Sequence, residues 1–213
     1  MLSLKPTPVV YVTRDIERAM GLPFDTPGYF IISNFTSFGK RVTKGRKNVL
    51  LIKEKRQLDT WELLRHPKVK EKIGERAVSI IVFKNTPQIE KICAENGWKL
   101  LNPQAELSNK IEEKISQIEW LGELKKYLPP YQIKKCRDIK FTGKKFIIQF
   151  NRSHTGSGTI LVNTKKILKD IKKIYPEREA RIAPYIKGPL FTNNNVVSKN
   201  KILIGNISYQ ITG

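Results

Sequence analysis

The stretch Phe146-Ile147-Ile148-Gln149-Phe150-Asn151 decides the fold, because it runs directly into Arg152-Ser153-His154-Thr155-Gly156-Ser157-Gly158-Thr159. The first six residues have the aromatic and β-branched character of a strand. The next eight are rich in glycine and hydroxyl groups, so backbone N–H groups can approach an anion closely and hydroxyls can add donors. The segment predicts a phosphate-binding loop, and an ordinary glycine-rich hairpin turn is the alternative. The chain contains neither a Walker motif nor a Rossmann fingerprint.

Around this loop the pattern predicts short strands about a single helix. Pro129-Pro130 ends the preceding helix, which is predicted over residues 109–124 from the spacing of its isoleucines and leucines. Strands are predicted over residues 131–136, 145–151, 158–162, 179–186, 192–198 and 201–210, and a helix over residues 164–174. This arrangement is typical of an α+β unit.

The N-terminal half has a different pattern. Strands are predicted over residues 9–13, 29–33 and 48–53, a basic loop over residues 38–47, and a helix that Asp59 would cap. Residues 77–101 read as strand, helix and strand, with Pro87 in the first turn of the helix and Gly97 after its end. Such alternation indicates a parallel sheet with helices on its faces. We therefore predict a small α/β domain over residues 1–103 and a second domain over residues 104–213.

Composition limits the class of protein. The chain has 213 residues, 39% hydrophobic and 28% charged, and a formal net charge of +21. Its two cysteines, Cys93 and Cys136, lie far apart and match no zinc-site spacing, which favours a reducing cytoplasm. The excess of positive charge is typical of proteins that bind polyanions, but it is spread along the chain and accompanies no known nucleic-acid motif. A basic nucleic-acid-binding protein is therefore the alternative function.

In this order of strand, glycine-rich loop, helix and later strands, the sequence resembles the ATP-grasp family. The resemblance covers about residues 101–213, and the first half is similar in pattern to the small α/β domain that precedes ATP-grasp domains. It implies that the loop closes over the phosphates of ATP and that a later strand forms a hinge for adenine. It also implies that a complete relative is a magnesium-dependent ligase, which activates a small-molecule carboxylate as an acylphosphate for attack by an amine or a thiol.

The resemblance assigns nucleotide-binding roles to particular residues. Lys114, or alternatively Lys110, would contact phosphate, and Gln149 stands where the family usually has a second lysine. The loop would comprise Ser153, His154, Thr155, Gly156, Ser157 and Gly158, with Arg152 before it. Pro184, Tyr185 and Ile186 would form the hinge, which reads adenine mainly through backbone groups.

Some residues depart from the family pattern. Gln149 brings no charge, and Ala183 and Leu190 fall where many members have acids for adenine and ribose; Asn193 or Asn194 would be the substitute. Family members place Mg²⁺ ligands on late strands, whereas this sequence ends at Gly213 directly after a predicted strand. We therefore expect a gene fragment, one half of a split reading frame or an artificially shortened chain, with weak ATP binding and no turnover of its own.

Overall fold

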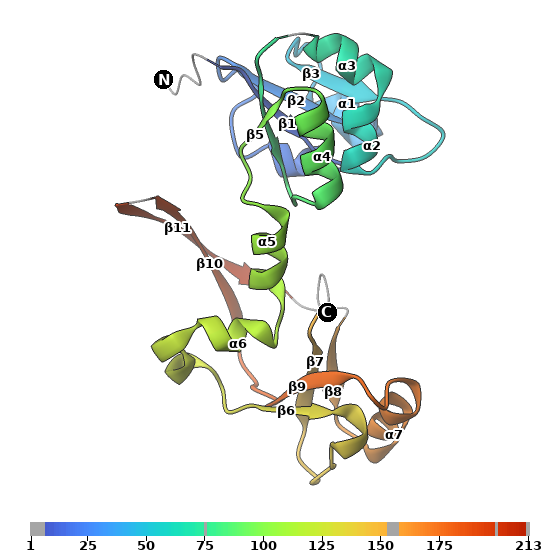
Figure 1. Ribbon diagram of the computed structural model, residues 1–213, viewed down its shortest axis with the longest axis vertical. Coiled ribbons are helices and arrows are strands. Elements are labelled where there is room, and N and C mark those ends of the chain that lie inside the picture. Colours follow the sequence, from blue (N-terminus) through green and yellow to red (C-terminus); the bar gives the residue numbers. More distant parts are fainter. Residues whose placement is uncertain (1–6, 75, 153–157, 199, 212–213) are drawn as a thin grey trace. The chain divides into compact units, whose positions relative to one another are not determined.

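The chain divides into two compact units, Met1–Glu112 and Glu113–Gly213. The structure is a computed structural model, and it describes residues 7–74, 76–152, 158–198 and 200–211 (Figure 1). Each unit has a hydrophobic core of its own. The domain boundary predicted between residues 103 and 104 precedes the last helix of the first unit and remains a prediction.

A five-stranded parallel sheet forms the first unit, as the strand–helix–strand pattern predicted. The strands have the order β3-β2-β1-β4-β5, and every neighbouring pair is parallel. Their bounds are β1 (Val9–Val12), β2 (Tyr29–Asn34), β3 (Val49–Ile52), β4 (Ser79–Val82) and β5 (Lys99–Leu100). Both faces bury apolar side chains, since β-branched and leucine residues occupy consecutive positions of the strands.

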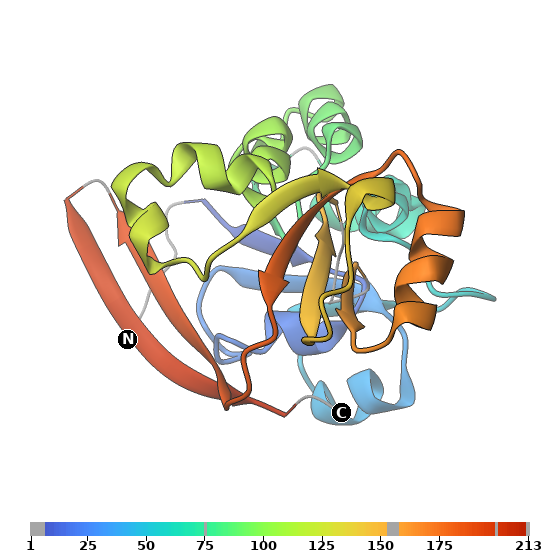
Figure 2. The same ribbon diagram turned by 90° about the horizontal axis from the view of Figure 1, so that it is seen from below.

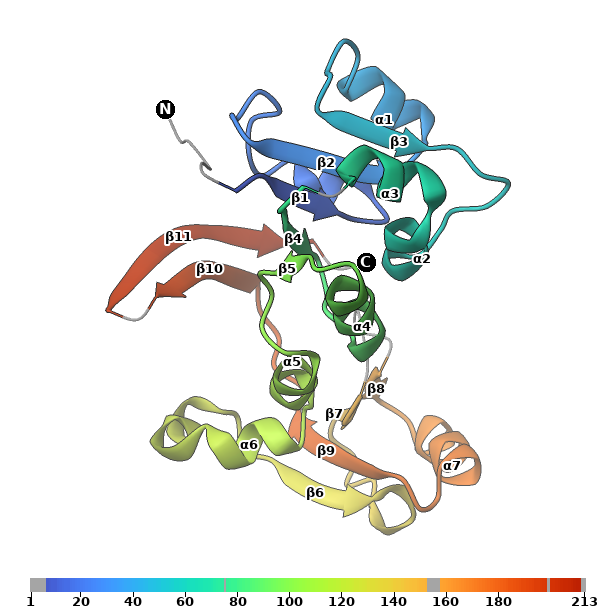
Figure 3. The ribbon, with the colours of Figure 1, turned by 45° about the horizontal axis from the view of Figure 1, so that its top comes forward.

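Helices cover both faces of this sheet (Figure 3). One face packs against α2 (Thr60–Arg65), α3 (Pro67–Ile73) and α4 (Pro87–Glu95), and the opposite face packs against η1 (Ile16–Ala19) and the region of α1 (Ser37–Val42). The prediction of a loop over residues 38–47 is wrong in its first part, where α1 forms. Thr36 caps this helix by accepting a hydrogen bond from the Gly39 N–H at 2.8 Å, and Phe38 packs against the sheet. The last helix of the unit is α5 (Ala105–Glu112).

Glu62 stabilises the start of α2, where the predicted capping residue Asp59 lies. The Glu62 carboxylate accepts from the Asp59 N–H at 2.8 Å and from the Arg56 guanidinium at 2.8 Å. The hydrogen bond from Arg56 contributes most to lowering the pKa of Glu62 from 4.5 to about 2, followed by the hydrogen bond from Asp59. Because the folded-state pKa is the lower one, Glu62 contributes stability above pH 4.5, and this contribution is lost as the pH falls toward 2.

We therefore predict that Glu62→Gln reduces the loss of stability between pH 5 and pH 2.5. The measurement is urea unfolding followed by circular dichroism across this pH range. Glu71→Gln is the matched control, since Glu71 is exposed on α3 and makes no ion pair within the described part of the chain. An equal pH dependence in wild type and the Glu62 variant would contradict the prediction.

The helix predicted over residues 109–124 is broken in the structure. Its residues fall in α5, in α6 (Ser116–Trp120) and in η2 (Gly122–Tyr127). Between α5 and α6, the Lys114 N–H donates to the Asn151 carbonyl at 3.0 Å and the Ile115 N–H donates to the Asn151 side-chain oxygen at 2.9 Å. These tertiary hydrogen bonds replace the helical ones, so the sequence periodicity alone could not reveal the break.

The second unit contains a four-stranded antiparallel sheet of order β6-β9-β7-β8. Its strands are β6 (Gln132–Lys135), β7 (Phe146–Phe150), β8 (Thr159–Val162) and β9 (Glu179–Pro184). A short turn, η3 (Cys136–Asp138), and α7 (Lys165–Ile174) complete its core on one face, as Figure 2 shows for α7. The strand and helix predictions for this region are confirmed to within two residues at each end.

A long hairpin of β10 (Leu190–Ser198) and β11 (Lys201–Gln210) follows β9 along the chain. Its register shifts between Asn193 and Asn195, where a β-bulge lies. A Cβ on Gly205 would lie 2.1 Å from the Asn194 carbonyl oxygen, so this position requires glycine. Many of the apolar side chains of the hairpin are exposed: Phe191, Val196, Val197, Ile202, Leu203, Ile204, Ile207 and Tyr209.

Both cysteines are free thiols buried in the two cores. Among the described helices, none has the length and apolar character needed to cross a membrane.

Candidate functional site

Gln149 lies on the face of the four-stranded sheet opposite α7. The alternate residues Phe146, Ile148 and Phe150 of the same strand are buried in the core with α7, and successive side chains of a strand point to opposite faces. Gln149 pairs with Thr159 of β8 on one side and with Arg181 of β9 on the other. These three polar residues therefore form a row across the sheet, near the ends of β7 and β8 that the predicted loop connects.

Arg181 and Gln149 are directly joined. The Nε and Nη2 groups of Arg181 donate to the Gln149 Oε1 atom at 3.0 and 2.5 Å, and the Gln149 Nε2 atom donates to the Thr159 hydroxyl at 3.4 Å. Burial lowers the pKa of Arg181, but an arginine remains charged at neutral pH. The row therefore carries a half-buried positive charge on Arg181, directly beside Gln149.

Sequence reasoning missed Arg181 as a site residue. The sequence contained only part of the information needed. The alternation of side chains shows which residues of each strand share a face of the sheet, but it does not show which residues of the two strands are paired. Pairing of Gln149 with Arg181, rather than with a neighbour two residues away, is a property of the folded sheet.

Lys114 lies next to the start of the predicted loop. Its N–H and that of Ile115 are hydrogen-bonded to Asn151, which immediately follows β7. Its half-buried side chain makes no ion pair within the described part of the chain. Lys110, the alternative phosphate lysine, belongs to α5 in the first unit.

Arg152 is held by an ion pair with Glu113. The Arg152 Nε atom lies 2.9 Å from the Glu113 Oε1 atom, and the Ser116 hydroxyl donates to the same carboxylate at 3.1 Å. The Arg152 guanidinium is the main cause that lowers the pKa of Glu113. Together with the hydrogen bonds of Asn151, this ion pair fixes residues 113–116 against the end of β7.

The predicted hinge lies at the other end of the same strands. Pro184 pairs with Phe146, whereas Gln149 pairs with Arg181, so the two positions are three residues apart along β7. At the rise of a strand this separation is about 10 Å, comparable with the distance from the base to the phosphates of a nucleotide. Tyr185 N–H donates to the Lys145 carbonyl at 3.4 Å, while Ile186 N–H donates to no backbone carbonyl of the residues that the structure describes.

Five of the predicted loop residues lie outside the described residues, namely Ser153, His154, Thr155, Gly156 and Ser157. Gly158, the last loop residue, is buried, and its carbonyl accepts from the Phe150 N–H at 3.0 Å. This hydrogen bond extends the pairing of β7 and β8 to the residues that flank the predicted loop.

The described residues do not fit a divalent metal ion. Within residues 7–74, 76–152, 158–198 and 200–211, no group of three or more His, Cys, Asp or Glu side chains could hold one. Mg²⁺ requires carboxylate and other oxygen ligands. We therefore assign no Mg²⁺ ligand to these residues.

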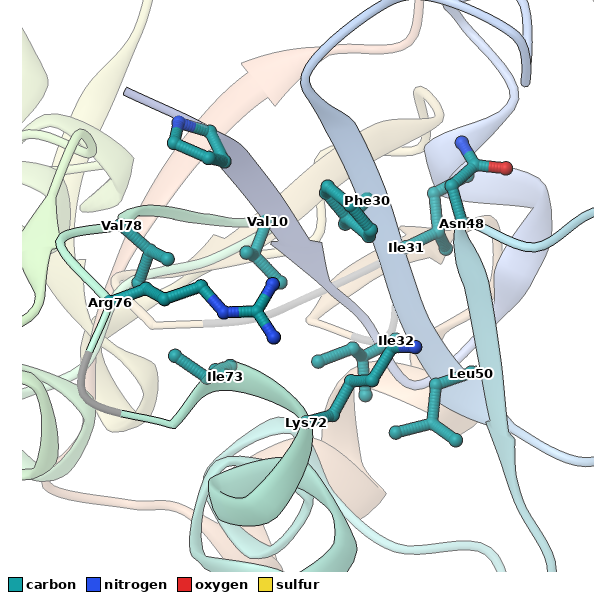
Figure 4. Close-up of a pocket in the computed structure, with 11 residues that line it drawn as sticks. Val10, Phe30, Ile31, Ile32, Asn48, Leu50, Lys72, Ile73, Arg76 and Val78 are labelled. Carbon is teal, nitrogen blue, oxygen red and sulfur yellow. The ribbon is translucent and has the colours of Figure 1, made fainter. Parts of the chain in front are cut away.

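Two hollows in the structure have different character. One of about 840 Å³ lies in the second unit and is bordered by Pro184 and Tyr185, which are predicted hinge residues. The other lies on the sheet of the first unit, between apolar side chains and the stems of Lys72 and Arg76 (Figure 4). Its volume of about 40 Å³ holds only a few water molecules, so we do not consider it a ligand site.

The sequence matches no protein-family model, and no curated protein matches it. Solved structures do match the fold. N5-carboxyaminoimidazole synthetase from Staphylococcus aureus in complex with ADP matches with a TM-score of 0.63 at 14% identity, over 100% of this chain and 56% of its own. D-Alanine-D-alanine ligase from Helicobacter pylori matches with a TM-score of 0.55 at 14% identity, over 96% of this chain and 75% of its own.

Biotin carboxylase from Campylobacter jejuni, in a complex described as β-γ-ATP, matches with a TM-score of 0.56 at 14% identity. That match covers 93% of this chain and 50% of the carboxylase. The chain thus spans about half the length of the synthetase and the carboxylase. At these identities, the likeness establishes the fold alone.

Proposed function

We propose that this chain, whose fold is that of the ATP-grasp ligases, binds ATP on the second unit along β7 and β9. The observation that carries the proposal is the Gln149–Arg181 pair, which provides a positive charge at one end of the two strands, while the residues proposed as the hinge lie at the other end. The neighbouring structures solved with ADP or ATP support a nucleotide as the ligand.

In this proposal, the phosphates lie at the end of β7 and the adenine lies at the hinge. Arg181 and Lys114 supply positive charge, Arg152 flanks the loop, and Gln149 holds Arg181 in place. The family resemblance assigns residues 153–158 to the phosphates, and residues 153–157 lie outside the described residues. Pro184 C=O and Ile186 N–H are the backbone groups offered to adenine beside Tyr185, and side-chain identity matters little there.

The whole protein to which this chain corresponds is proposed to be a carboxylate–amine or carboxylate–thiol ligase. The γ-phosphoryl group of ATP is transferred to a substrate carboxylate, and the amine or thiol then attacks the acylphosphate and releases phosphate. Positive groups that stabilise the charge on the transferred phosphoryl group contribute to such a reaction. The two buried free cysteines support a cytoplasmic location.

We predict that residues 1–213 bind ATP weakly and without turnover. Gln149 replaces a charged lysine, so affinity in the range of 0.1–1 mM, about −4 to −5.5 kcal/mol, is expected. Isothermal titration with ATP gives the affinity, and hydrogen exchange locates the protected strands. Protection should fall on β7, β8 and β9. Absence of saturable binding up to about 10 mM, or protection confined to the first unit, would contradict the proposal.

A further inference from the structure

Two hollows of the second unit share lining residues on the side of the sheet that carries α7. The larger one also reaches Lys145, Ala183 and Tyr185, whose positions in the strands belong to the opposite side. The larger, of about 840 Å³, lies among β6, β9 and residues 138–146, and the smaller, of about 370 Å³, lies between residues 139–141 and α7. Ile139 and Lys140 line both hollows, so the two hollows are neighbours, and we call their lysine-bearing lining the basic surface.

Lysines dominate this surface. Lys134, Lys140, Lys144 and Lys145 line the larger hollow, and Lys140, Lys165, Lys169 and Lys172 line the smaller one. In the part of the chain that the structure describes, none of these lysines forms an ion pair, and Asp138 is the only acidic lining residue. The Asp138 carboxylate lies 3.8 Å from the Arg137 guanidinium, and the positive charge of Arg137 offsets the negative charge of Asp138.

The secondary structure determines on which side of the sheet these lysines lie. Lys165, Lys169 and Lys172 are spaced by four and three residues, so they share one face of α7. Lys134 pairs with Ala180, whose side chain belongs to the core beneath α7, so Lys134 lies on the α7 side of the sheet. Gln149 and Arg181 lie on the opposite side of the sheet. Lys134 and the lysines of α7 therefore lie away from the proposed phosphate end of the ATP site, whereas the larger hollow borders the proposed hinge at Pro184 and Tyr185.

We propose that this basic surface binds the phosphodiester backbone of a single-stranded nucleic acid. Lysines act as mobile point charges for phosphate oxygens. Tyr131 lines the larger hollow and is partly exposed, so its ring is available for an unpaired base to stack on. An acidic protein would use the lysines but would gain nothing comparable from the concave, ring-lined hollow. The net charge of +21 favours association of a polyanion from a distance.

The test is a salt titration of binding to a fluorescein-labelled oligouridylate of about 15 nucleotides, followed by fluorescence anisotropy. The slope of the logarithm of the binding constant against the logarithm of the salt concentration is the quantity compared. In the variant Lys140→Ala/Lys144→Ala/Lys169→Ala, this slope should fall in magnitude by about 0.7 per lysine, and hence by about 2. At about 150 mM salt the affinity should fall by about 10- to 100-fold. ATP affinity, measured by isothermal titration, should not change.

The matched control removes three lysines from another basic segment, with Lys40→Ala, Lys44→Ala and Lys47→Ala. These residues are exposed in the first unit and belong to a run with five basic residues in positions 40–47. The control should keep the wild-type slope. An equal or greater loss in the control would overturn the proposal, because the binding would then be diffuse or centred on residues 40–47.

Two further outcomes would also overturn it. In the first, polyglutamate of the same charge binds as tightly as the oligouridylate. The basic surface would then be a binding site for acidic proteins. A variant that loses ATP affinity together with oligouridylate affinity would show that the hollow is part of the nucleotide site. Circular dichroism of each variant establishes that the loss does not arise from unfolding.

Discussion

Replacing Arg181 by alanine is expected to weaken ATP binding by about 10- to 100-fold. A hydrogen bond from a charged group to a ligand contributes about 1.5–3 kcal/mol, and each 1.4 kcal/mol corresponds to a factor of ten. Two donors of Arg181 are aimed at Gln149, which holds the guanidinium on the open face of the sheet. Isothermal titration with ATP measures the change.

The conservative variant separates charge from geometry. Arg181→Lys keeps the charge but cannot form the two-donor contact with Gln149, so we expect an intermediate loss of affinity. Arg137→Ala is the control, since Arg137 is an exposed arginine of the same unit that pairs with Glu177. If Arg181→Ala binds ATP as wild type does while remaining folded, the phosphates do not lie at this end of the sheet.

The Gln149→Ala variant tests whether Gln149 acts through Arg181. If Gln149 only positions the guanidinium, then the double variant Gln149→Ala/Arg181→Ala should bind ATP no more weakly than Arg181→Ala. Additive losses would instead indicate that Gln149 contacts the nucleotide directly.

Replacing Ile148 by alanine is expected to destabilise the second unit by about 2–5 kcal/mol. Ile148 is fully buried between the sheet and α7, so truncation leaves a cavity in addition to the lost apolar burial. Hydrogen exchange of the β7 and β9 amides should accelerate by about 30-fold or more, and ATP affinity should fall with the population of the folded unit.

Ile80→Ala is the matched comparison, because Ile80 is equally buried in the core of the first unit. The Ile80→Ala variant should accelerate hydrogen exchange of the β1 and β4 amides by a similar factor. Since each unit has its own core, exchange in β7 should respond to Ile148→Ala far more strongly than to Ile80→Ala. Equal acceleration of β7 in both variants would mean that the two units unfold as one.

The elements that the sequence predicted well are those whose pattern is local. The parallel sheet of the first unit follows from buried strands alternating with amphipathic helices, and β4 and α4 were recognisable from the run 77–83 and from Pro87. The strands of the second unit follow from short apolar runs separated by turns. The helical break near Lys114 was missed because it depends on Asn151, which is distant in the sequence. The helix α1 was missed although its cap, Thr36, is adjacent to it in the sequence.

The sequence by itself determined the strand over residues 146–150 and the order of elements, since composition and periodicity are properties of neighbouring residues. It also identified Lys114, Gln149 and the hinge residues as candidates through resemblance. Only the tertiary structure decided that Asn151 holds residues 114 and 115, that Arg181 stands beside Gln149, and that lysines from β6, α7 and residues 140–145 share one surface. Such contacts depend on strand register and on packing between segments far apart in the chain, which a one-dimensional pattern does not specify.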